Sequence, residues 1–330
     1  MHITFFCIGD IHTPSTRLRL LNYLPWLKKK SISYDLVFAT DKSKLIRNIK
    51  RIFGAVRAVR SDIVFIQKLT LPPFIINLLK INSKLIYDFD DALYVETQNQ
   101  KKRSHRLNYI LQKSDLVIAG NDELKRYAMG YNQHVVTLPT PVPEIKQGPS
   151  KSKDPDALKT IGWIGSAHNL YNLEEKKDLF LKFMTQREDW QLHVVSNGSF
   201  SLDGFDHRVK NFKWTLETED QMIADFDIGI MPLENSEWNR GKCAYKALQM
   251  MAVGKPVVAS PVGMNTTVIA NNVNGYLADT DEAWLDALQK LLSSSDLRKS
   301  IGEHAAETVA RHYILAVLKN QFISLLASVL

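Results

Sequence analysis

The sequence predicts an α/β protein built from two doubly wound, Rossmann-like domains that face a central cleft. Apolar runs of strand length alternate with helix-like segments through residues 3–130, and the alternation restarts after residue 158. Such alternation is typical of parallel sheets that are covered by helices. A stretch rich in Pro, Ser, Lys and Asp, residues 139–156, separates the two series and has the composition of a linker.

We therefore expect an N-terminal domain over residues 1–145, a linker over 146–157, a C-terminal domain over 158–311 and a final helix over 312–330. The final segment is mostly apolar, so we expect it to cross back and pack on the N-terminal domain. The expected strands are residues 3–8, 36–39, 63–66, 85–87 and 116–119, then 160–164, 192–195, 209–212, 228–231, 257–260 and 276–277. The expected helices lie near residues 16–29, 42–60, 73–80, 101–113 and 121–130, then 171–187, 218–224, 243–253, 282–293 and 296–311.

Composition indicates a cytoplasmic globular protein. Hydrophobic residues make up 45% of the chain and charged residues 23%. Cys7 and Cys243 lie far apart without CxxC spacing, which fits a reducing compartment and predicts neither a disulfide framework nor a zinc site. The first residues lack the basic region of a signal peptide, and no apolar run reaches the ~18 residues of a membrane span.

Positive charge is concentrated at the start of the chain. The net charge is +7, and residues 1–60 alone hold 12 Lys and Arg against 3 Asp. In the helix expected at 42–60, apolar residues fall on one side and basic residues largely on the other. This pattern fits a helix that covers a sheet with a solvated back. It also fits a basic face that meets anionic lipid at the inner face of the plasma membrane, and both can hold at once.

Residues 238–275 carry the strongest chemical signal and read WNRGKCAYKALQMMAVGKPVVASPVGMNTTVIANNVNG. Lys242 and Lys246 stand in the first two turns of the helix expected near 243–253, on one side of it, with Arg240 just before. Cations are unfavourable at a helix start unless an anion faces them. We therefore interpret this stretch as a nucleotide-diphosphate site, the alternative being a solvated basic helix face.

The turn after the first strand of the second series offers backbone N–H groups to the same ligand. Gly165 and Ser166 stand between a strand and a helix, where a phosphate can approach the chain closely. An ordinary strand–helix turn is the alternative.

Two further groups follow strands of the first series. The loop after the first strand runs from Gly9 into a helix start with Arg17 and Arg19, which indicates a nearby anion or only surface charge. Asp90 and Asp91 follow the fourth strand, beside Asp88, where carboxylates suit sugar hydroxyls. Three carboxylates together can also indicate Mg²⁺, and a solvated loop is the third interpretation. Elsewhere, Asn121 is a candidate cap for the helix after the fifth strand.

The run KALQMMAVGKPVVASPVG, followed by NNVNGYLADTDEAW, resembles the C-terminal domain of the family 4 glycosyltransferases, glycosyl transferases group 1. IGWIGS and SDLVIAGNDELKRYA extend the resemblance to most of the chain. It implies the two-domain GT-B fold and a retaining transfer from a nucleotide-diphosphate sugar, UDP- or GDP-linked, to a saccharide or lipid-linked acceptor. It implies no metal or other cofactor and no nucleic-acid partner, and the setting expected is bacterial surface polysaccharide or lipopolysaccharide synthesis.

The chain departs from the family pattern at several positions. The acidic pair of the family falls on Gly241 and Gln249, and Gln249 can still bond the ribose hydroxyls. Gly263 belongs to the family's glycine-rich loop, but Thr267 stands where a Glu is typical. The diphosphate charge would then be met by Lys242 and Lys246. These departures leave two alternatives open, a non-catalytic protein that binds a nucleotide or a partner and an inverting GT-B transferase or epimerase.

Overall fold

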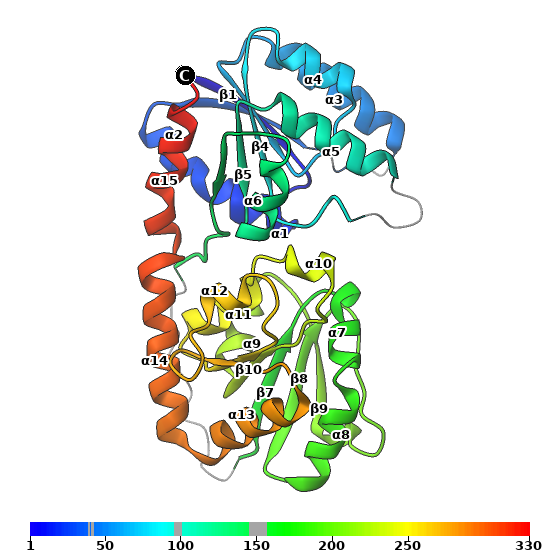
Figure 1. Cartoon of the computed structure of the whole chain (residues 1–330), viewed down its shortest axis with the longest axis vertical. Coiled ribbons are helices and arrows are strands. Elements are labelled where there is room, and N and C mark those ends of the chain that lie inside the picture. Colours follow the sequence, from blue (N-terminus) through cyan, green and yellow to red (C-terminus); the bar gives the residue numbers. More distant parts are fainter. Residues whose placement is uncertain (39, 41–42, 96–100, 145–156) are drawn as a thin grey trace. The chain divides into compact units, whose positions relative to one another are not determined.

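The computed structural model describes residues 1–38, 40, 43–95, 101–144 and 157–330 (Figure 1). The chain forms two compact units. The N-terminal unit comprises residues 1–143, 240–243 and 314–330, and the C-terminal unit comprises residues 144–239 and 244–313. Each contains a parallel six-stranded sheet, which confirms the predicted fold class. Residues 146–156 of the expected linker lie outside the described residues.

The sheet of the N-terminal unit has the order β2-β1-β3-β4-β5-β6. Because β1 lies between β2 and β3, the chain winds outward in both directions, and its switch point lies between β1 and β3. The edge strand β6 was not predicted from the sequence. The strands are β1 (His2–Cys7), β2 (Ser33–Phe38), β3 (Ile63–Gln67), β4 (Lys84–Phe89), β5 (Leu116–Ala119) and β6 (Val135–Thr137).

One face of this sheet is covered by elements from both ends of the chain (Figure 1). They are α1 (Pro14–Arg19), the 3₁₀ turn η1 (Leu21–Tyr23), α2 (Leu24–Lys29) and α15 (Leu315–Ala327). Phe322 of α15 stacks on Tyr23 with ring centroids 4.1 Å apart, and Leu315 N–H donates to Val142 O at 3.0 Å. The final helix therefore packs on the N-terminal unit, as predicted. The single helix expected at 16–29 is instead divided, with Pro25 in the first turn of α2.

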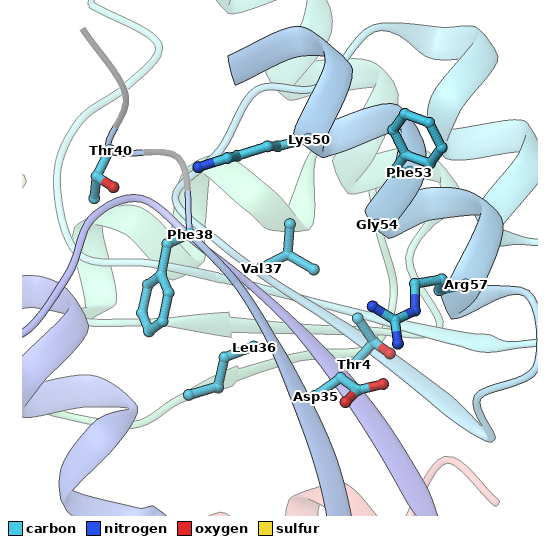
Figure 2. A pocket seen from close by; sticks show the side chains of 10 residues that line it. All are labelled: Thr4, Asp35, Leu36, Val37, Phe38, Thr40, Lys50, Phe53, Gly54 and Arg57. Carbon is cyan, nitrogen blue, oxygen red and sulfur yellow. The ribbon is translucent and has the colours of Figure 1, made fainter. Parts of the chain in front are cut away.

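The opposite face is covered by α3 (Lys44–Ala58), α4 (Pro73–Leu79) and α5 (Lys101–Lys113), while α6 (Asp122–Met129) follows β5. The sheet-covering interpretation of α3 requires the helix to bury its large apolar side chains. It does not bury them. Gly54, Ala55 and Ala58 face the sheet instead, and a Cβ on Gly54 would lie 2.9 Å from Val37. A groove of about 460 Å³ remains between α3 and the edge strand β2 (Figure 2).

The sheet of the C-terminal unit has the order β12-β11-β10-β7-β8-β9, so its switch point lies between β7 and β10. Residues on one sheet face alternate with residues on the other. Gly229 in β10 faces Met250, whereas its neighbours Ile228 and Ile230 belong to the main hydrophobic cluster. The strands are β7 (Lys159–Ile164), β8 (Trp190–Ser196), β9 (Val209–Lys213), β10 (Ile228–Met231), β11 (Val257–Ala259) and β12 (Tyr276–Leu277).

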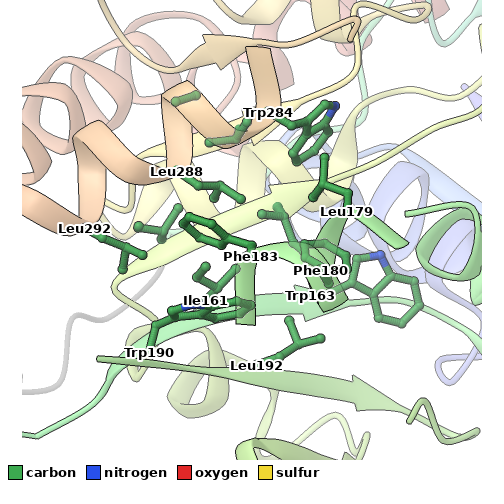
Figure 3. Close-up of a cluster of buried hydrophobic side chains, with 14 of the residues drawn as sticks. Ile161, Trp163, Leu179, Phe180, Phe183, Trp190, Leu192, Trp284, Leu288 and Leu292 are labelled. Atoms are coloured by element: carbon green, nitrogen blue, oxygen red, sulfur yellow. The ribbon is translucent and has the colours of Figure 1, made fainter. Parts of the chain in front are cut away.

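Large aromatic side chains fill the core of the C-terminal unit (Figure 3). Phe180 and Phe183 of α8 pack with Trp190 of β8 and Trp284 of α13, all almost completely buried. The helix expected at 171–187 is split into two. The helices are α7 (Tyr171–Glu174), α8 (Lys177–Gln186), α9 (Glu219–Ala224), α10 (Glu237–Arg240), α11 (Tyr245–Ala252), α12 (Asn265–Val268), α13 (Asp281–Ser293) and α14 (Ser295–His312), with 3₁₀ turns η2 (Ala167–Asn169) and η3 (Asp206–Arg208).

A buried ion pair joins the first helix of the N-terminal unit to its central sheet. Arg19 of α1 donates from Nε to Asp88 Oδ2 at 3.0 Å and also bonds Asp88 through Nη2. Its Nη1 donates to Leu138 O at 2.9 Å and to Thr140 Oγ1 at 3.1 Å. Both charged side chains are 2% exposed. Such a pair is costly to break because the remaining charge stays buried without its partner.

We expect Asp88→Asn to lower the free energy of unfolding by about 3–5 kcal/mol, since Arg19 then keeps a buried charge without a carboxylate. The measurement is urea unfolding of the full chain. Asp189→Asn makes the same change in an exposed Arg187–Asp189 pair and should cost less than about 1 kcal/mol. Equal effects of the two substitutions would contradict a special role for the buried pair.

Candidate functional site

The candidate donor site of the C-terminal unit begins at the turn after β7. Gly165 N–H donates to Val195 O at 3.1 Å, and a Cβ on Gly165 would lie 2.6 Å from the Trp163 ring. Only glycine fits here without a shift of that ring. Ser166 is exposed and leads into η2, where Asn169 Nδ2 donates to Ser166 Oγ at 3.0 Å. Both predicted residues therefore lie at the carboxyl end of β7, beside the switch point.

A second part of this site is the start of α11. Lys246 Nζ donates to Gln249 Oε1 at 2.8 Å, one helical turn away. It also lies 3.7 Å from the Glu219 carboxylate of α9, which accepts a hydrogen bond from Trp214 Nε1 at 2.9 Å. Gln249 and Glu219 are buried, so Lys246 holds the more accessible position. The predicted Lys246 and Gln249 are thus brought together, with an added carboxylate.

Glu219 is a residue that the sequence analysis missed. It stands on a separate helix, and spacing along the chain gives no signal that α9 and α11 touch. The packing of α9 on α11 thus places a carboxylate beside Lys246. The Glu219 carboxylate offsets the unfavourable interaction of Lys246 with the positive end of the helix dipole.

The loop after β11 is tied to the loop after β10. Ser260 Oγ accepts from Leu233 N–H at 2.9 Å, and Asn265 Nδ2 donates to Ser260 O at 3.0 Å. Gly263 between them has φ +56°, the left-handed region that favours glycine. The predicted Gly263 therefore lies in an ordered turn at the carboxyl edge of the sheet.

Lys242 does not share a helix face with Lys246, so this expectation was wrong. Helix α11 begins only at Tyr245, because Ala244 before it adopts φ +49° and interrupts the helix. Residues 240–243 belong instead to the N-terminal unit. There Asn121, which caps α6 as predicted, donates through Nδ2 to Arg240 O at 3.2 Å and to Lys242 O at 3.0 Å.

Gly241 explains why this segment can lie so close to the N-terminal sheet. A Cβ at position 241 would lie 2.6 Å from Ala92 Cβ and 2.8 Å from Ala92 N. Two residues further along the same segment, the Cys243 thiol donates to Asp90 O at 3.3 Å. A Glu at position 241 would therefore clash with backbone in this structure, which gives a physical reason for the departure from the family pattern.

Residues from α1 and from the loops after β3 and β4 meet at the carboxyl edge of the N-terminal sheet. Ser15 Oγ donates to Asp90 Oδ2 at 2.8 Å, and Lys68 Nζ lies 2.9 Å from Asp90 Oδ1. Lys68 also donates to Asp91 and, at 3.1 Å, to Ser15 Oγ. Lys68, just after β3, was not singled out in the sequence because a single lysine after a strand has no distinctive pattern. Its φ of +58° shows that the fold holds it in a strained backbone conformation.

The charges of this group stabilise one another. Burial alone would raise the pKa of Asp90, but Lys68 and Arg19 hold it below its usual value. Burial alone would lower the pKa of Lys68, but Asp90 and Asp91 raise it above its usual value. Burial lowers the pKa of Lys242, while Asp91 acts in the opposite direction. Asp90 is therefore a carboxylate at neutral pH, suited to accept hydrogen bonds and not to donate a proton.

The loop after β1 is ordered by its own hydrogen bonds. Gly9 N–H donates to Thr16 Oγ1 at 3.2 Å, and a Cβ on Gly9 would lie 1.9 Å from Thr13 Oγ1. Arg17 donates through Nη1 to Ile11 O at 3.1 Å. Arg19 was predicted to meet a phosphate, but the anion that it meets is Asp88. All of its side-chain nitrogens donate to protein oxygens, so we do not retain it as a substrate ligand.

Among the residues that the structure describes, no group of three or more His, Cys, Asp or Glu side chains has the geometry to hold a metal ion. Within the same residues, no helix is long and apolar enough to cross a membrane. The candidate sites therefore consist of lysines, carboxylates, amides and backbone groups.

Comparison with known proteins gives a family match to part of the chain. Residues 159–294 match the model of the family "Glycosyl transferases group 1". The chain is 24% identical over 252 residues to D-inositol 3-phosphate glycosyltransferase of Corynebacterium urealyticum, a match that covers 66% of this chain and 58% of that relative.

Solved structures agree over nearly the whole chain. HepE of Anabaena in complex with UDP and glucose superposes with a TM-score of 0.76 at 13% identity and 99% coverage of both chains. Sucrose-phosphate synthase of Thermosynechococcus elongatus superposes with a TM-score of 0.73 at 14% identity, over 99% of this chain and 98% of that one. At these identities the agreement shows the fold, GT-B. The chain thus has the GT-B fold, and residues 159–294 within it match the glycosyl transferases group 1 family.

Proposed function

We propose that the protein transfers a sugar from a UDP- or GDP-linked donor to a saccharide or lipid-linked acceptor, with retention of the anomeric configuration. The observation that carries the donor site is the group of Lys246, Gln249 and Glu219 at the start of α11, inside the residues that match the family. Two solved structures of Anabaena HepE contain UDP with glucose and UDP-glucose, which supports a nucleotide-sugar donor.

In this proposal each donor ligand has a distinct task. Lys246 neutralises the diphosphate, which carries the negative charge that develops as the sugar leaves. Gln249 offers its amide to the ribose hydroxyls. Ser166 and Gly263 bring backbone N–H groups to the edge of the sheet, where a phosphate can be held without a metal ion. Gly165, whose own N–H donates to Val195 O, lets a phosphate approach the chain closely.

The acceptor is proposed to bind the N-terminal unit. Asp91 is the more exposed carboxylate of the Lys68 group, at 28% against 13% for Asp90, so it is the one placed to accept a bond from a sugar hydroxyl. Asp90 and Lys68 hold it in position. Gly9 and Arg17 border the same sheet edge, and Lys242 adds a charge that suits a phosphorylated acceptor.

We place this reaction in bacterial surface polysaccharide or lipopolysaccharide synthesis, at the cytoplasmic side of the membrane. The support is the basic N-terminal region, in which residues 1–60 carry 12 Lys and Arg against 3 Asp. Such a region suits acceptors that are phosphorylated or carried on lipid.

A thermal-shift series with UDP, GDP, ADP, CMP and dTDP tests the donor site, because a ligand that binds only the folded state raises Tm. We expect UDP or GDP to raise Tm, and Lys246→Ala to weaken that nucleotide's binding at least about tenfold through loss of a charged contact. Lys299→Ala, an exposed lysine of the same unit, is the matched control and should bind normally. Absence of any shift in the unmodified chain would count against the proposal.

Asp91→Asn should reduce transfer by about 100-fold while leaving the affinity for the nucleotide unchanged, because the substitution removes the charge that meets the acceptor. The measurement is release of the nucleotide product with acceptor present, alongside nucleotide binding. Asp62→Asn, on the N-terminal side of β3, is the control and should keep full activity. Full activity of Asp91→Asn would remove this residue from the mechanism.

Retention itself is tested on the product of the unmodified enzyme. Proton NMR of the first-formed glycoside reads its anomeric configuration directly. We expect the configuration of the donor sugar. An inverted product would support the alternative of an inverting GT-B transferase, and donor binding without any product would support a protein that only binds.

A further inference from the structure

Helix α3 exposes a continuous apolar stripe. Leu45, Ile49, Ile52, Phe53 and Val56 stand at i, i+4, i+7, i+8 and i+11, which places them on one side of a helix. Their exposed fractions run from 43% at Ile49 to 69% at Leu45.

This stripe lies opposite the face that holds the helix on the sheet. Gly54, Ala55 and Ala58, the small residues of α3, are buried against the sheet. Burial of a large apolar side chain contributes about 1.5–3 kcal/mol, and the stripe leaves this contribution unrealised in the isolated chain. A contiguous exposed apolar face of this kind marks an interaction site.

Positive charge borders the stripe along one side. Lys50 and Arg57 point from α3 toward β2, where they line the groove with Phe38 and Phe53; Asp35 also lies there (Figure 2). The groove therefore has two cations and one carboxylate, and it opens beside the apolar stripe. An apolar face bordered by Lys and Arg is the arrangement of helices that lie in a membrane surface.

Further cations stand behind the helix. Burial lowers the pKa of Arg51, and the charges of Arg47 and Arg106 act in the same direction. The field on this part of the unit is thus positive beyond the two groove residues. An anion near the helix would relieve this repulsion.

The charge also decides between two possible occupants. A second copy of this chain packed on the stripe would bring Lys50 and Arg57 of one α3 against the same cations of the other. Anionic lipid, in contrast, is attracted by about 1 kcal/mol for each Lys or Arg close to the membrane.

We propose that α3 docks the protein on an anionic phospholipid bilayer, with Leu45, Phe53 and their apolar neighbours inserted among the acyl chains. Lys50 and Arg57 meet lipid phosphates at the groove. The inference rests on the proposed function for its membrane setting, but the docking itself needs neither donor nor acceptor.

The test is co-sedimentation of the full chain with two kinds of vesicle, phosphatidylcholine alone and phosphatidylcholine with one third phosphatidylglycerol. We expect binding to the anionic vesicles that weakens with added salt, because screening reduces the attraction. The double variant Leu45→Ser/Phe53→Ser should bind at least about tenfold more weakly, from the lost apolar insertion. Lys50→Ala/Arg57→Ala should lose the preference for anionic vesicles.

The matched control is Met129→Ser/Val273→Ser, which removes two exposed apolar side chains elsewhere and should bind as the unmodified chain does. All variants should keep the nucleotide-induced rise in Tm, so loss of docking is distinguishable from loss of the donor site. Equal binding of the Leu45→Ser/Phe53→Ser variant, or no binding to anionic vesicles, would overturn the proposal. So would a dimer in vesicle-free sedimentation that this variant abolishes, because a second copy would then cover the stripe.

Discussion

The buried pair of Arg19 and Asp88 is the contact on which the candidate site of the N-terminal unit depends. Asp88 is the penultimate residue of β4, and the two residues after that strand's end are Asp90 and Asp91. Arg19 fixes the end of α1 against the same strand and also binds Leu138 O beyond β6. The loops that carry Ser15 and Asp90 are thereby anchored at both ends. Ser15 and Asp90 can then form their 2.8 Å hydrogen bond without the entropic cost of ordering a free loop.

The same pair sets the chemistry of the site. Because Arg19 neutralises Asp88, the Asp88 charge adds little to the group in which Lys68 meets Asp90 and Asp91. Lys68 and Arg19 keep the pKa of Asp90 low, and Asp90 and Asp91 keep the pKa of Lys68 high, so the group stays ionised at neutral pH. A site of this kind orients hydroxyls and charges; it does not exchange protons.

The fold could be predicted from the sequence because several buried parallel strands, such as Leu116–Ala119 and Val257–Ala259, are unbroken apolar runs. Eleven of the twelve described strands were anticipated; the exception, β6, has only three residues. The candidate site was harder to predict from the sequence. Lys246 was singled out by its place near a helix start and Gln249 by the resemblance to the family pattern, and the two lie one helical turn apart. Glu219 and Lys68 join their partners only through packing of elements distant in sequence. The predicted helix start near residue 243 was wrong because Ala244 adopts a left-handed backbone, a conformation that an alanine in the sequence does not indicate.

Helix α3 shows how an amphipathic pattern can mislead. The pattern identifies an apolar side but not what covers it, and the usual assumption is that the sheet does. Here three small residues give the helix a close fit to β2 and β1, since a Cβ on Gly54 would lie 2.9 Å from Val37 and 3.4 Å from Phe6. Close approach of backbone to sheet leaves no room for large side chains on that side, so they are displaced outward. The sequence of α3 is therefore consistent with its structure only when the small residues, and not the large ones, are taken as the sheet-facing set.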